Sequence, residues 1–417
     1  MILAICAIIV LVLLFLRMPV FVALLSGTVV YFIITPGLAP QIIAQRVLSG
    51  VENVPLLAIP FFVCSGIIMN YSGVTQRVLR FCEILVRRLP GGIAQVNVLM
   101  SLIMGGLSGS NLADAAMTSK ILVPEMEKRG FTKEFSSVLT ATSAMITPLI
   151  PPGIAMIIYG SMSTVSIGKL FMACIGPGLL LCAALMIYVG YVSKRKNFKQ
   201  EDLAKGITMG EAFKDAFFPL LLPVVIIGGI RIGAFTPTEA GAVAIIYAIF
   251  LSIIYREFRL SKMVQALKET VLSTSSILLI VGAASAFAWV LTREQVPQQL
   301  TGTIVGAISN KYLFLLFVNV FILFVGMVIE GNALLIILVP ILSPIAAKYG
   351  INDIHFAVMF IFNISVGAMT PPVGTLMFVT CGITGCKIAD FIKEAVPFYI
   401  ILGTCLLMLT FVPFLFY

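Results

Sequence analysis

Apolar runs of about 20 residues recur from one end of the chain to the other, and this is the length that an α-helix needs to cross a bilayer. None of these runs alternates between apolar and polar residues as the strands of a transmembrane barrel do. The pattern therefore predicts an all-α polytopic membrane protein. We expect nine crossings, at about 2–34, 52–71, 135–163, 170–192, 216–233, 239–256, 270–293, 353–385 and 388–416.

Two further apolar segments, at about 96–125 and 312–346, are interrupted by a polar tip that contains glycine. Each arm of these segments has about 12–18 residues, and most arms are too short to cross about 30 Å of hydrocarbon at about 1.5 Å per residue. We therefore expect two re-entrant helical hairpins, each of which enters and leaves the membrane on one side.

The positions of the basic residues test this layout. If the first hairpin returns to its own side, nineteen of the 27 Lys and Arg residues share one face, in loops at 72–95, 126–134, 193–215, 257–269 and 386–393. The opposite face then holds only Arg46, Lys169, Arg231, Arg293, Lys311 and Lys348. The positive-inside rule makes the first face cytoplasmic, which predicts a cytoplasmic N-terminus and a periplasmic C-terminus.

The first apolar stretch, Met1–Leu16, has no basic region before it and no small-residue cleavage site after it. We therefore expect a retained first helix rather than a cleaved signal peptide. The composition agrees with a lipid environment, because 60% of the residues are hydrophobic and 11% are charged, against about 25% charged residues in soluble domains. These values exclude a soluble enzyme, a nucleic-acid binder and a disordered scaffold.

The net charge of +9 would suggest nucleic acid in a soluble protein, but here the basic residues lie mostly in short loops. Nucleic acid is therefore not an expected partner. The eight cysteines are scattered, mostly inside apolar runs, and no pair has metal-ligand spacing beside histidines. We interpret them as small apolar side chains that fill space.

The second half of the chain repeats features of the first at an offset of 220 residues. Matching positions follow in order, namely Lys128 and Lys348, Gly130 and Gly350, Pro151-Pro152 and Pro371-Pro372, Phe171 and Phe391, and Pro177 and Pro397. In the layout above the first hairpin enters from the cytoplasm and the second from outside, so the repeats are inverted. Inverted repeats with broken helices are typical of secondary transporters, which bind substrate and ions near the midplane.

The repeat predicts a division of the chain into two kinds of unit. We expect scaffold helices at 1–95, a first transport unit at 96–192, a cytoplasmic loop with further scaffold helices at 193–310, and a second, inverted transport unit at 311–417. Each transport unit then contains one hairpin and one helix broken by proline.

Polar residues gather at the hairpin tips and at the proline breaks, which lie at about 140–153 and 367–375. Proline has no N–H, so carbonyls in the preceding turn lose their helical partners. At membrane depth, such groups are tolerated only where they meet protein, water or an ion. Oxygen ligands without a carboxylate cage suit Na⁺, and we predict two Na⁺ sites, one in each repeat. The alternative is that Ser, Thr and Gly only pack the helices and that the prolines only kink them.

Asp114 and Glu330 are the acids that fall clearly inside the hairpins. An acid within the membrane is a functional candidate by default, although Asp114 could instead pair with Lys120 or cap a hairpin arm. Helix N-termini at Asn111 and Asn332 would present their positive ends to an anionic substrate. We take as substrate-binding candidates the residues Asn111, Asp114, Asn332, Pro152 and Pro372.

The stretch Gly228–Gly241 (GGIRIGAFTPTEAG) has a structural explanation. Thr236 is a typical N-cap, Pro237 suits the first helical position, and Glu239 completes a capping box. Arg231 is expected at the outer interface, and attraction of an anion is a second possibility for it.

One enzymatic hypothesis starts from Gly106–Gly109 (GLSG), which matches the pattern around the nucleophile of an intramembrane serine protease. His355 is the single histidine and could activate Ser108. However, our layout places His355 at the outer edge and Ser108 in a hairpin that enters from the cytoplasm. We therefore expect no enzymatic activity.

Six motifs together resemble the large membrane subunit of tripartite ATP-independent periplasmic (TRAP) transporters, and the resemblance covers nearly the whole chain. They are Leu57–Phe62 (LAIPFF), Gly105–Asp114 (GGLSGSNLAD), Ile121–Gly130, Thr147–Gly153, Gly233–Ala240 (GAFTPTEA) and Met369–Gly374 (MTPPVG). The resemblance implies a fold with an elevator-like mechanism and transport driven by a Na⁺ gradient without nucleotide hydrolysis. It also implies Na⁺ sites at Ser108, Ser110, Asn111 and Thr147, and at Gly326, Gly367, Thr370 and Gly374.

The same resemblance implies two protein partners, a small membrane subunit of four helices and a periplasmic binding protein that delivers an anionic, carboxylate-bearing substrate. We expect Na⁺-coupled import of an organic acid, either sialic acid or a four-carbon dicarboxylate, across a bacterial inner membrane. The alternative is a stand-alone Na⁺/dicarboxylate symporter of the divalent-anion class, which needs no binding protein. Glu330 stands where the first tip has serine, which puts equal Na⁺ affinity of the two sites in doubt.

Overall fold

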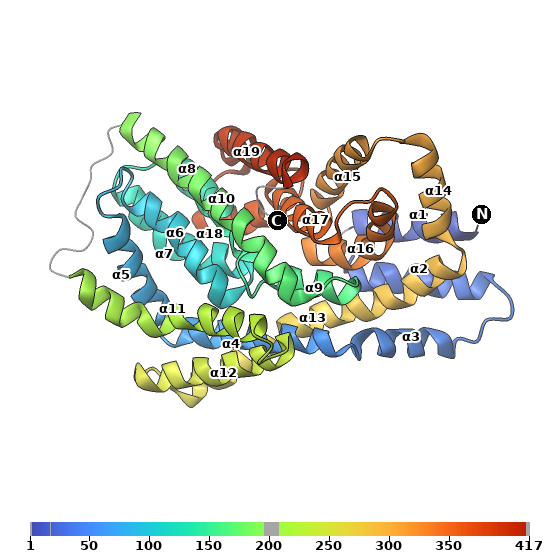
Figure 1. Ribbon diagram of the computed structural model, residues 1–417, viewed down its shortest axis with the longest axis horizontal. Helices are drawn as coiled ribbons and strands as arrows, with labels where there is room; N and C mark the ends of the chain where they lie inside the picture. Colours follow the sequence, from blue (N-terminus) through green and yellow to red (C-terminus); the bar gives the residue numbers. More distant parts are fainter. Residues whose placement is uncertain (1, 17, 196–207, 414–417) are drawn as a thin grey trace.

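The computed structural model describes residues 2–16, 18–195 and 208–413, and within these ranges the protein is helical and contains no strand (Figure 1). The first half comprises α1 (Ile2–Phe15), α2 (Val20–Ile34), α3 (Gln41–Val51), η1 (Val54–Leu57), α4 (Ala58–Tyr71), α5 (Val74–Val86), α6 (Ile93–Ser108), α7 (Asn111–Lys128), α8 (Lys133–Ala144), η2 (Thr147–Leu149), α9 (Ile154–Met162) and α10 (Ile167–Arg195).

Two long helices, α11 (Met209–Arg231) and α12 (Pro237–Ile254), connect this half to the second. The second half comprises α13 (Leu260–Arg293), α14 (Val296–Ala307), α15 (Lys311–Gly326), α16 (Gly331–Lys348), α17 (Asp353–Met369), α18 (Thr375–Thr384) and α19 (Ile388–Phe411). The all-α fold class predicted from the apolar runs is therefore confirmed.

Seven helices of the described chain are long and apolar enough to cross a membrane, and α8 with α9, bent by 46°, forms an eighth candidate. They include the crossings predicted at 52–71, 135–163, 170–192, 216–233, 239–256, 270–293 and 388–416. The crossing predicted at 353–385 is divided between α17 and α18 by a break. The seventh long helix is α16, the second arm of the second hairpin, so length alone does not distinguish an arm from a crossing.

The single crossing predicted at 2–34 is wrong. α1 and α2 pack against each other as a helical hairpin, and a Cβ atom added to Gly27 would lie only 2.5 Å from Cγ2 of Val10. Pro19 precedes α2, and proline disfavours helical backbone at the residue before it, which explains why the run divides there. The N-terminus and the α2–α3 connection lie at the same end of the molecule (Figure 1), so the layout no longer supports a cytoplasmic N-terminus.

The repeat is visible in the order of the elements. α3–η1–α4, α5, the α6–α7 hairpin, α8–η2–α9 and α10 recur as α13, α14, the α15–α16 hairpin, α17–α18 and α19. The two halves also make reciprocal contacts, because α7 packs on α18 while α16 packs on α9, and α10 packs on α17 while α19 packs on α8. Units related by a two-fold axis contact each other in this reciprocal way.

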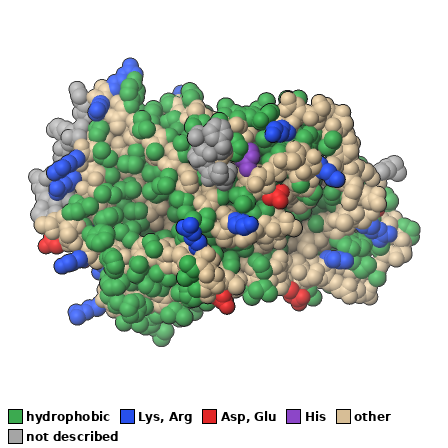
Figure 2. All heavy atoms as spheres, in the orientation of Figure 1, with side chains coloured by type: hydrophobic (Ala, Val, Ile, Leu, Met, Phe, Trp, Pro, Cys, Tyr) green, Lys and Arg blue, Asp and Glu red, His purple; other side chains and the backbone are tan. Residues whose placement is uncertain are grey.

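Two of the loops that the charge pattern assigned to one face lie next to each other, at 72–95 and 257–269. Arg77 lies over the ring of Tyr255, with its guanidinium carbon 3.7 Å from the ring centroid, and Lys262 forms an ion pair with Glu257 at 2.7 Å. Lys196, Lys199 and Lys205 lie outside the described residues. Figure 2 shows basic side chains at the left end and, beside them, a broad hydrophobic surface suited to lipid.

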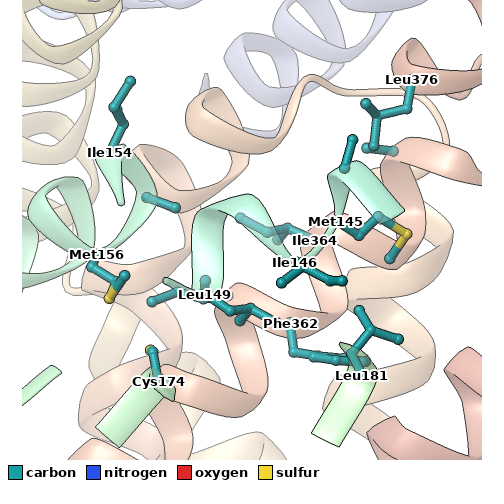
Figure 3. Close-up of a cluster of buried hydrophobic side chains, with 14 of the residues drawn as sticks. Met145, Ile146, Leu149, Ile154, Met156, Cys174, Leu181, Phe362, Ile364 and Leu376 are labelled. Atoms are coloured by element: carbon teal, nitrogen blue, oxygen red, sulfur yellow. The ribbon is translucent and has the colours of Figure 1, made fainter. Parts of the chain in front are cut away.

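A cluster of buried hydrophobic side chains lies around the two breaks (Figure 3). Met145, Ile146 and Leu149 come from the first break, whereas Phe362 and Ile364 come from α17 directly before the second. All five side chains are buried. Apolar packing from both repeats thus holds the two irregular segments next to each other, which positions the polar groups described below.

Candidate functional site

The tips of the two hairpins meet at one small cavity. Gly109–Leu112 of the first tip and Glu330–Asn332 of the second line it, together with residues that flank the two breaks, namely Pro148, Ile154, Ala155, Ile364, Ser365, Ala368 and Thr375. The free volume is about 40 Å³. Because one water needs about 10–15 Å³ of such space, the cavity has room for an ion or a few waters but not for an organic acid.

Two helix N-termini face this cavity from opposite repeats. Ser110 caps α7, since its hydroxyl accepts a hydrogen bond from the N–H of Ala113 at 3.4 Å. Glu330 caps α16, since its carboxylate accepts one from the N–H of Ala333 at 3.1 Å. Both N-termini line one cavity, and a positive helix end suits a negative charge, which the carboxylate of Glu330 supplies at α16.

That Glu330 caps a helix was not predicted from the sequence. Its position corresponds to Ser110 at the repeat offset of 220 residues, and both residues are N-caps. Asn332 is consequently the second residue of its helix, whereas Asn111 is the first. The offset that aligns the proline pairs also aligns these two residues. A capping residue at one tip therefore indicates a capping residue at the same position of the other tip.

Each tip is bonded to the break of its own repeat. The carbonyl of Gly109 accepts a hydrogen bond from the N–H of Ile154 at 3.3 Å. In the second repeat the carbonyl of Met327 accepts from the N–H groups of Val373 at 3.1 Å and Gly374 at 3.3 Å. The tip-plus-break pairs expected from the sequence are therefore direct contacts, and they bring irregular backbone of two segments together within the core.

The four residues predicted for the second cation site lie close together. A Cβ atom on Gly367 would lie 2.9 Å from Cα of Gly326, and one on Gly374 would lie 3.0 Å from the carbonyl oxygen of Thr370. The hydroxyl of Thr370 donates to the carbonyl of Val366 at 2.7 Å. The backbones approach so closely that only glycine fits at Gly367, which leaves carbonyl oxygens as the main available ligands.

The residues predicted for the first cation site form two layers. Ser110 and Asn111 line the tip cavity, whereas Thr147 is fully buried beneath it. The hydroxyl of Thr147 donates to Oδ2 of Asp114 at 3.2 Å. Within the described chain, Oδ1 of Asp114 and Oγ of Ser108 are buried without a hydrogen-bond partner.

Asp114 therefore does not pair with Lys120, which is exposed. Buried carboxylates and hydroxyls are normally hydrogen-bonded, and a buried charge needs a compensating partner. The unsatisfied oxygens of Asp114 and Ser108 are hard ligands of the kind that a monovalent cation uses. The residues present are therefore compatible with a Na⁺ ion.

The substrate-binding candidates have different surroundings. Asn111 and Asn332 line the tip cavity, and Asp114 lies below it. The carbonyl oxygen of Pro152 abuts Gly109, where a Cβ atom would lie 2.3 Å from it. Pro372 lines a neighbouring cavity of about 650 Å³ between the second tip and the α1–α2 turn, and Glu330 borders both cavities.

Comparison with known proteins agrees with this geometry. Residues 7–415 match the family described as the tripartite ATP-independent periplasmic transporter, DctM component. The chain belongs to this family. It is 40% identical to the sialic acid TRAP transporter large permease protein SiaM of Vibrio cholerae over 368 aligned residues. The alignment covers 88% of this chain and 86% of that protein.

A second relative of the TRAP permease is the C4-dicarboxylate TRAP transporter large permease protein DctM of Pseudomonas aeruginosa, 36% identical over 390 residues, with 93% of this chain and 91% of that protein covered. The YdaH transporter of Alcanivorax borkumensis has a similar structure, with a TM-score of 0.65 at 14% identity over 88% of this chain and 87% of that one. At this identity the likeness shows the fold alone.

Membership in a transporter family excludes the protease hypothesis for the TRAP permease. The surroundings of the two residues agree, because Nε2 of His355 lies 2.9 Å from the carbonyl oxygen of Leu409 in α19. Ser108 instead packs against α4, where a Cβ atom on Gly66 would lie 3.0 Å from its Cα. His355 thus connects α17 to α19 through a contact with the backbone and does not activate a hydroxyl.

We expect His355→Ala to retain uptake, because the ring makes a structural contact far from the tip cavity. Loss of one buried hydrogen bond is expected to lower the free energy of unfolding by about 1–2 kcal/mol. Thermal unfolding in detergent and uptake per folded protein measure the two effects separately. Abolished uptake by a normally folded variant would contradict this role.

The capping box predicted at Thr236 is confirmed. The N–H of Thr236 donates to Oε2 of Glu239 at 2.8 Å, and the N–H of Glu239 donates to the hydroxyl of Thr236 at 3.3 Å. We expect Thr236→Ala to destabilise the TRAP permease by about 1 kcal/mol, since an N-cap is lost. Thermal unfolding checks this value, with Thr404→Ala on the exposed side of α19 as the matched control.

Proposed function

We propose that this TRAP permease carries an organic acid across the bacterial inner membrane, driven by a Na⁺ gradient. The observation that carries the proposal is the meeting of two capped helix N-termini, from opposite repeats, at one small cavity. Such a pair of positive helix ends suits a carboxylate near the midplane of a transporter with discontinuous helices.

The proposed Na⁺ sites lie beside this cavity. Ser108, Ser110, Asn111 and Thr147 would hold one ion, and the charge of Asp114 supports assigning this carboxylate to the cation rather than to the substrate. Gly326, Gly367, Thr370 and Gly374 would hold the other. The unpartnered oxygens of Asp114 and Ser108 support the first site, and the clustered carbonyls around the second tip support the second.

An elevator-like movement fits the size of the tip cavity. At about 40 Å³ the cavity is too small for an organic acid, so the tips must separate or move before substrate enters. The first tip packs tightly on α4 and α11, since a Cβ atom on Gly106 would lie 2.7 Å from Pro223. The second tip borders the open cavity of about 650 Å³. We infer that the second tip moves more readily than the first.

The family's description as tripartite supports two protein partners, a periplasmic binding protein and a small membrane subunit. For substrate, the relatives named for sialic acid and for C4-dicarboxylates support these two acids as the first to test. A stand-alone Na⁺/dicarboxylate symporter is the competing function.

Uptake into proteoliposomes tests the proposal. We expect accumulation of labelled sialic acid or succinate only when the permease is combined with its small subunit, its binding protein and an inward Na⁺ gradient. Replacing the Na⁺ gradient by a K⁺ gradient is expected to abolish accumulation. Uptake by this chain alone, without the other two proteins, would establish the stand-alone symporter instead.

Two single substitutions test the cation sites. Asn111→Ala and Thr370→Ala are each expected to raise the Na⁺ concentration for half-maximal uptake several-fold, because each removes a polar group from one predicted site. Thr404→Ala, an exposed threonine on α19, is the control. If both variants keep the Na⁺ dependence of the parent protein, the assignment of the sites is incorrect.

A further inference from the structure

A cavity of about 850 Å³ lies between two walls and has Lys169 and Arg231 among its lining residues. One wall comes from the α9–α10 connection and the start of α10. The other comes from η1, the end of α11 and the start of α12, whose ends lie near α9 in Figure 1. Asn53 bridges the walls, with its side-chain amide donating to the carbonyl of Ser161 at 3.3 Å.

The two charged residues that line this cavity are both positive. Lys169 belongs to α10 and Arg231 to α11, so two positive side chains line opposite walls. No acidic residue is among the lining residues, and neither cation forms an ion pair within the described chain. The nearest carboxylate on the α12 wall, Glu239, is already engaged in the capping box with Thr236. Both side chains are exposed, and two like charges on facing walls favour an anion between them.

The rest of the wall is apolar. Phe171, Met172, Ile227 and Ile230 are among the lining residues, and Met172 is 39% exposed. Ile232, directly after Arg231, is 81% exposed, as expected of a side chain that faces lipid. Such a surface offers water few hydrogen-bond partners. A polyhydroxylated acid that lay along it would lose the hydrogen bonds that its hydroxyl groups make with water.

We propose that this cavity binds an anionic phospholipid, with the phosphate between Lys169 and Arg231 and an acyl chain along the apolar wall. Both basic residues belong to the set that the charge pattern places on one face, at the level where Lys and Arg meet headgroups. The bound phosphate joins the α9–α10 wall to the α11–α12 wall and removes the repulsion between their two cations. This lipid site is separate from the tip cavity, and binding to it requires no transport.

The test is lipid retention by the purified permease, measured by native mass spectrometry after exchange through vesicles of phosphatidylcholine with or without phosphatidylglycerol. We expect the parent protein to retain phosphatidylglycerol and not phosphatidylcholine. The double variant Lys169→Gln/Arg231→Gln is expected to lose retention by roughly tenfold or more, since each basic residue contributes to headgroup binding. Lys311→Gln/Lys348→Gln, outside the cavity, is the matched control.

A second variant separates the cavity from surface charge. Ala173 lines the wall, and Ala173→Phe is expected to narrow the apolar part of the cavity and weaken retention while both cations remain. Equal retention by the parent protein and by both variants would overturn the proposal. Displacement of the lipid by the small membrane subunit, or by sialic acid or succinate in solution, would overturn it as well, because the cavity would then belong to a protein partner or to the substrate.

Discussion

Gly109→Ala is expected to reduce Na⁺-driven uptake at least about a hundredfold while the protein still folds. A Cβ atom at this position would lie 2.3 Å from the carbonyl oxygen of Pro152, which is backbone and cannot rotate away. The tip must therefore shift, and the hydrogen bond from Ile154 to the carbonyl of Gly109 is lost. Displacing a binding group by about 1 Å is enough for an effect of this size.

The matched control for this variant is Gly350→Ala. Gly109 has φ of 61° and Gly350 has φ of 66°, so both substitutions place alanine in left-handed backbone and carry a similar strain of about 1 kcal/mol. Nothing lies within 4 Å of a Cβ atom at Gly350. Uptake per folded protein, measured for both variants, isolates the contact with Pro152. Similar uptake by the two variants would mean that transport does not depend on the contact between tip and break.

The hairpins and broken helices could be predicted because their signals are local. Pro151-Pro152 and Pro371-Pro372 mark the breaks, and glycine-rich polar tips interrupt the hairpin arms. The fold of α1 and α2 could not be read in the same way. An apolar run has the same composition whether it forms one long helix or two short ones that fold back, and only Pro19 marks the turn.

The candidate site was only partly accessible from sequence for a related reason. Composition and spacing place polar residues at each tip. That the two tips meet at one cavity depends on tertiary packing between the repeats, which these local signals do not contain. The alternative pairing of Asp114 with Lys120 illustrates this limit, since it rested on sequence proximity, whereas the fold brings Thr147 from the break to the carboxylate. Capping at Glu330 required the exact register of the repeat, which the tip sequences alone do not fix.

The second large effect is expected for Asp114→Asn, which retains the shape of the side chain and removes its charge. The carboxylate is buried, it accepts a hydrogen bond from the hydroxyl of Thr147, and its Oδ1 has no hydrogen-bond partner by distance and angle in the described structure. If Na⁺ compensates this charge, the variant loses a buried charge pair whose disruption costs about 3–5 kcal/mol. Uptake is then expected to fall by about two to four orders of magnitude.

The effect on stability should have the opposite sign in the absence of Na⁺. The parent protein then contains an uncompensated buried carboxylate, so Asp114→Asn is expected to be as stable as the parent protein or more stable. Adding Na⁺ at about 100 times its dissociation constant should stabilise the parent protein by about 2.7 kcal/mol and leave the variant unchanged. Thermal unfolding in NaCl and in KCl measures both effects.

Glu125→Gln is the matched control for Asp114→Asn, because Glu125 lies on the same helix and forms an exposed ion pair with Lys128 at 2.7 Å. Exposed pairs contribute about 0–1 kcal/mol, so this variant should keep both uptake and Na⁺-dependent stabilisation. Unchanged stabilisation by Na⁺ in Asp114→Asn would show that the carboxylate does not face the cation. Loss of uptake together with unchanged stabilisation by Na⁺ would assign Asp114 to substrate binding, because the charge would then act on the organic acid rather than on the ion.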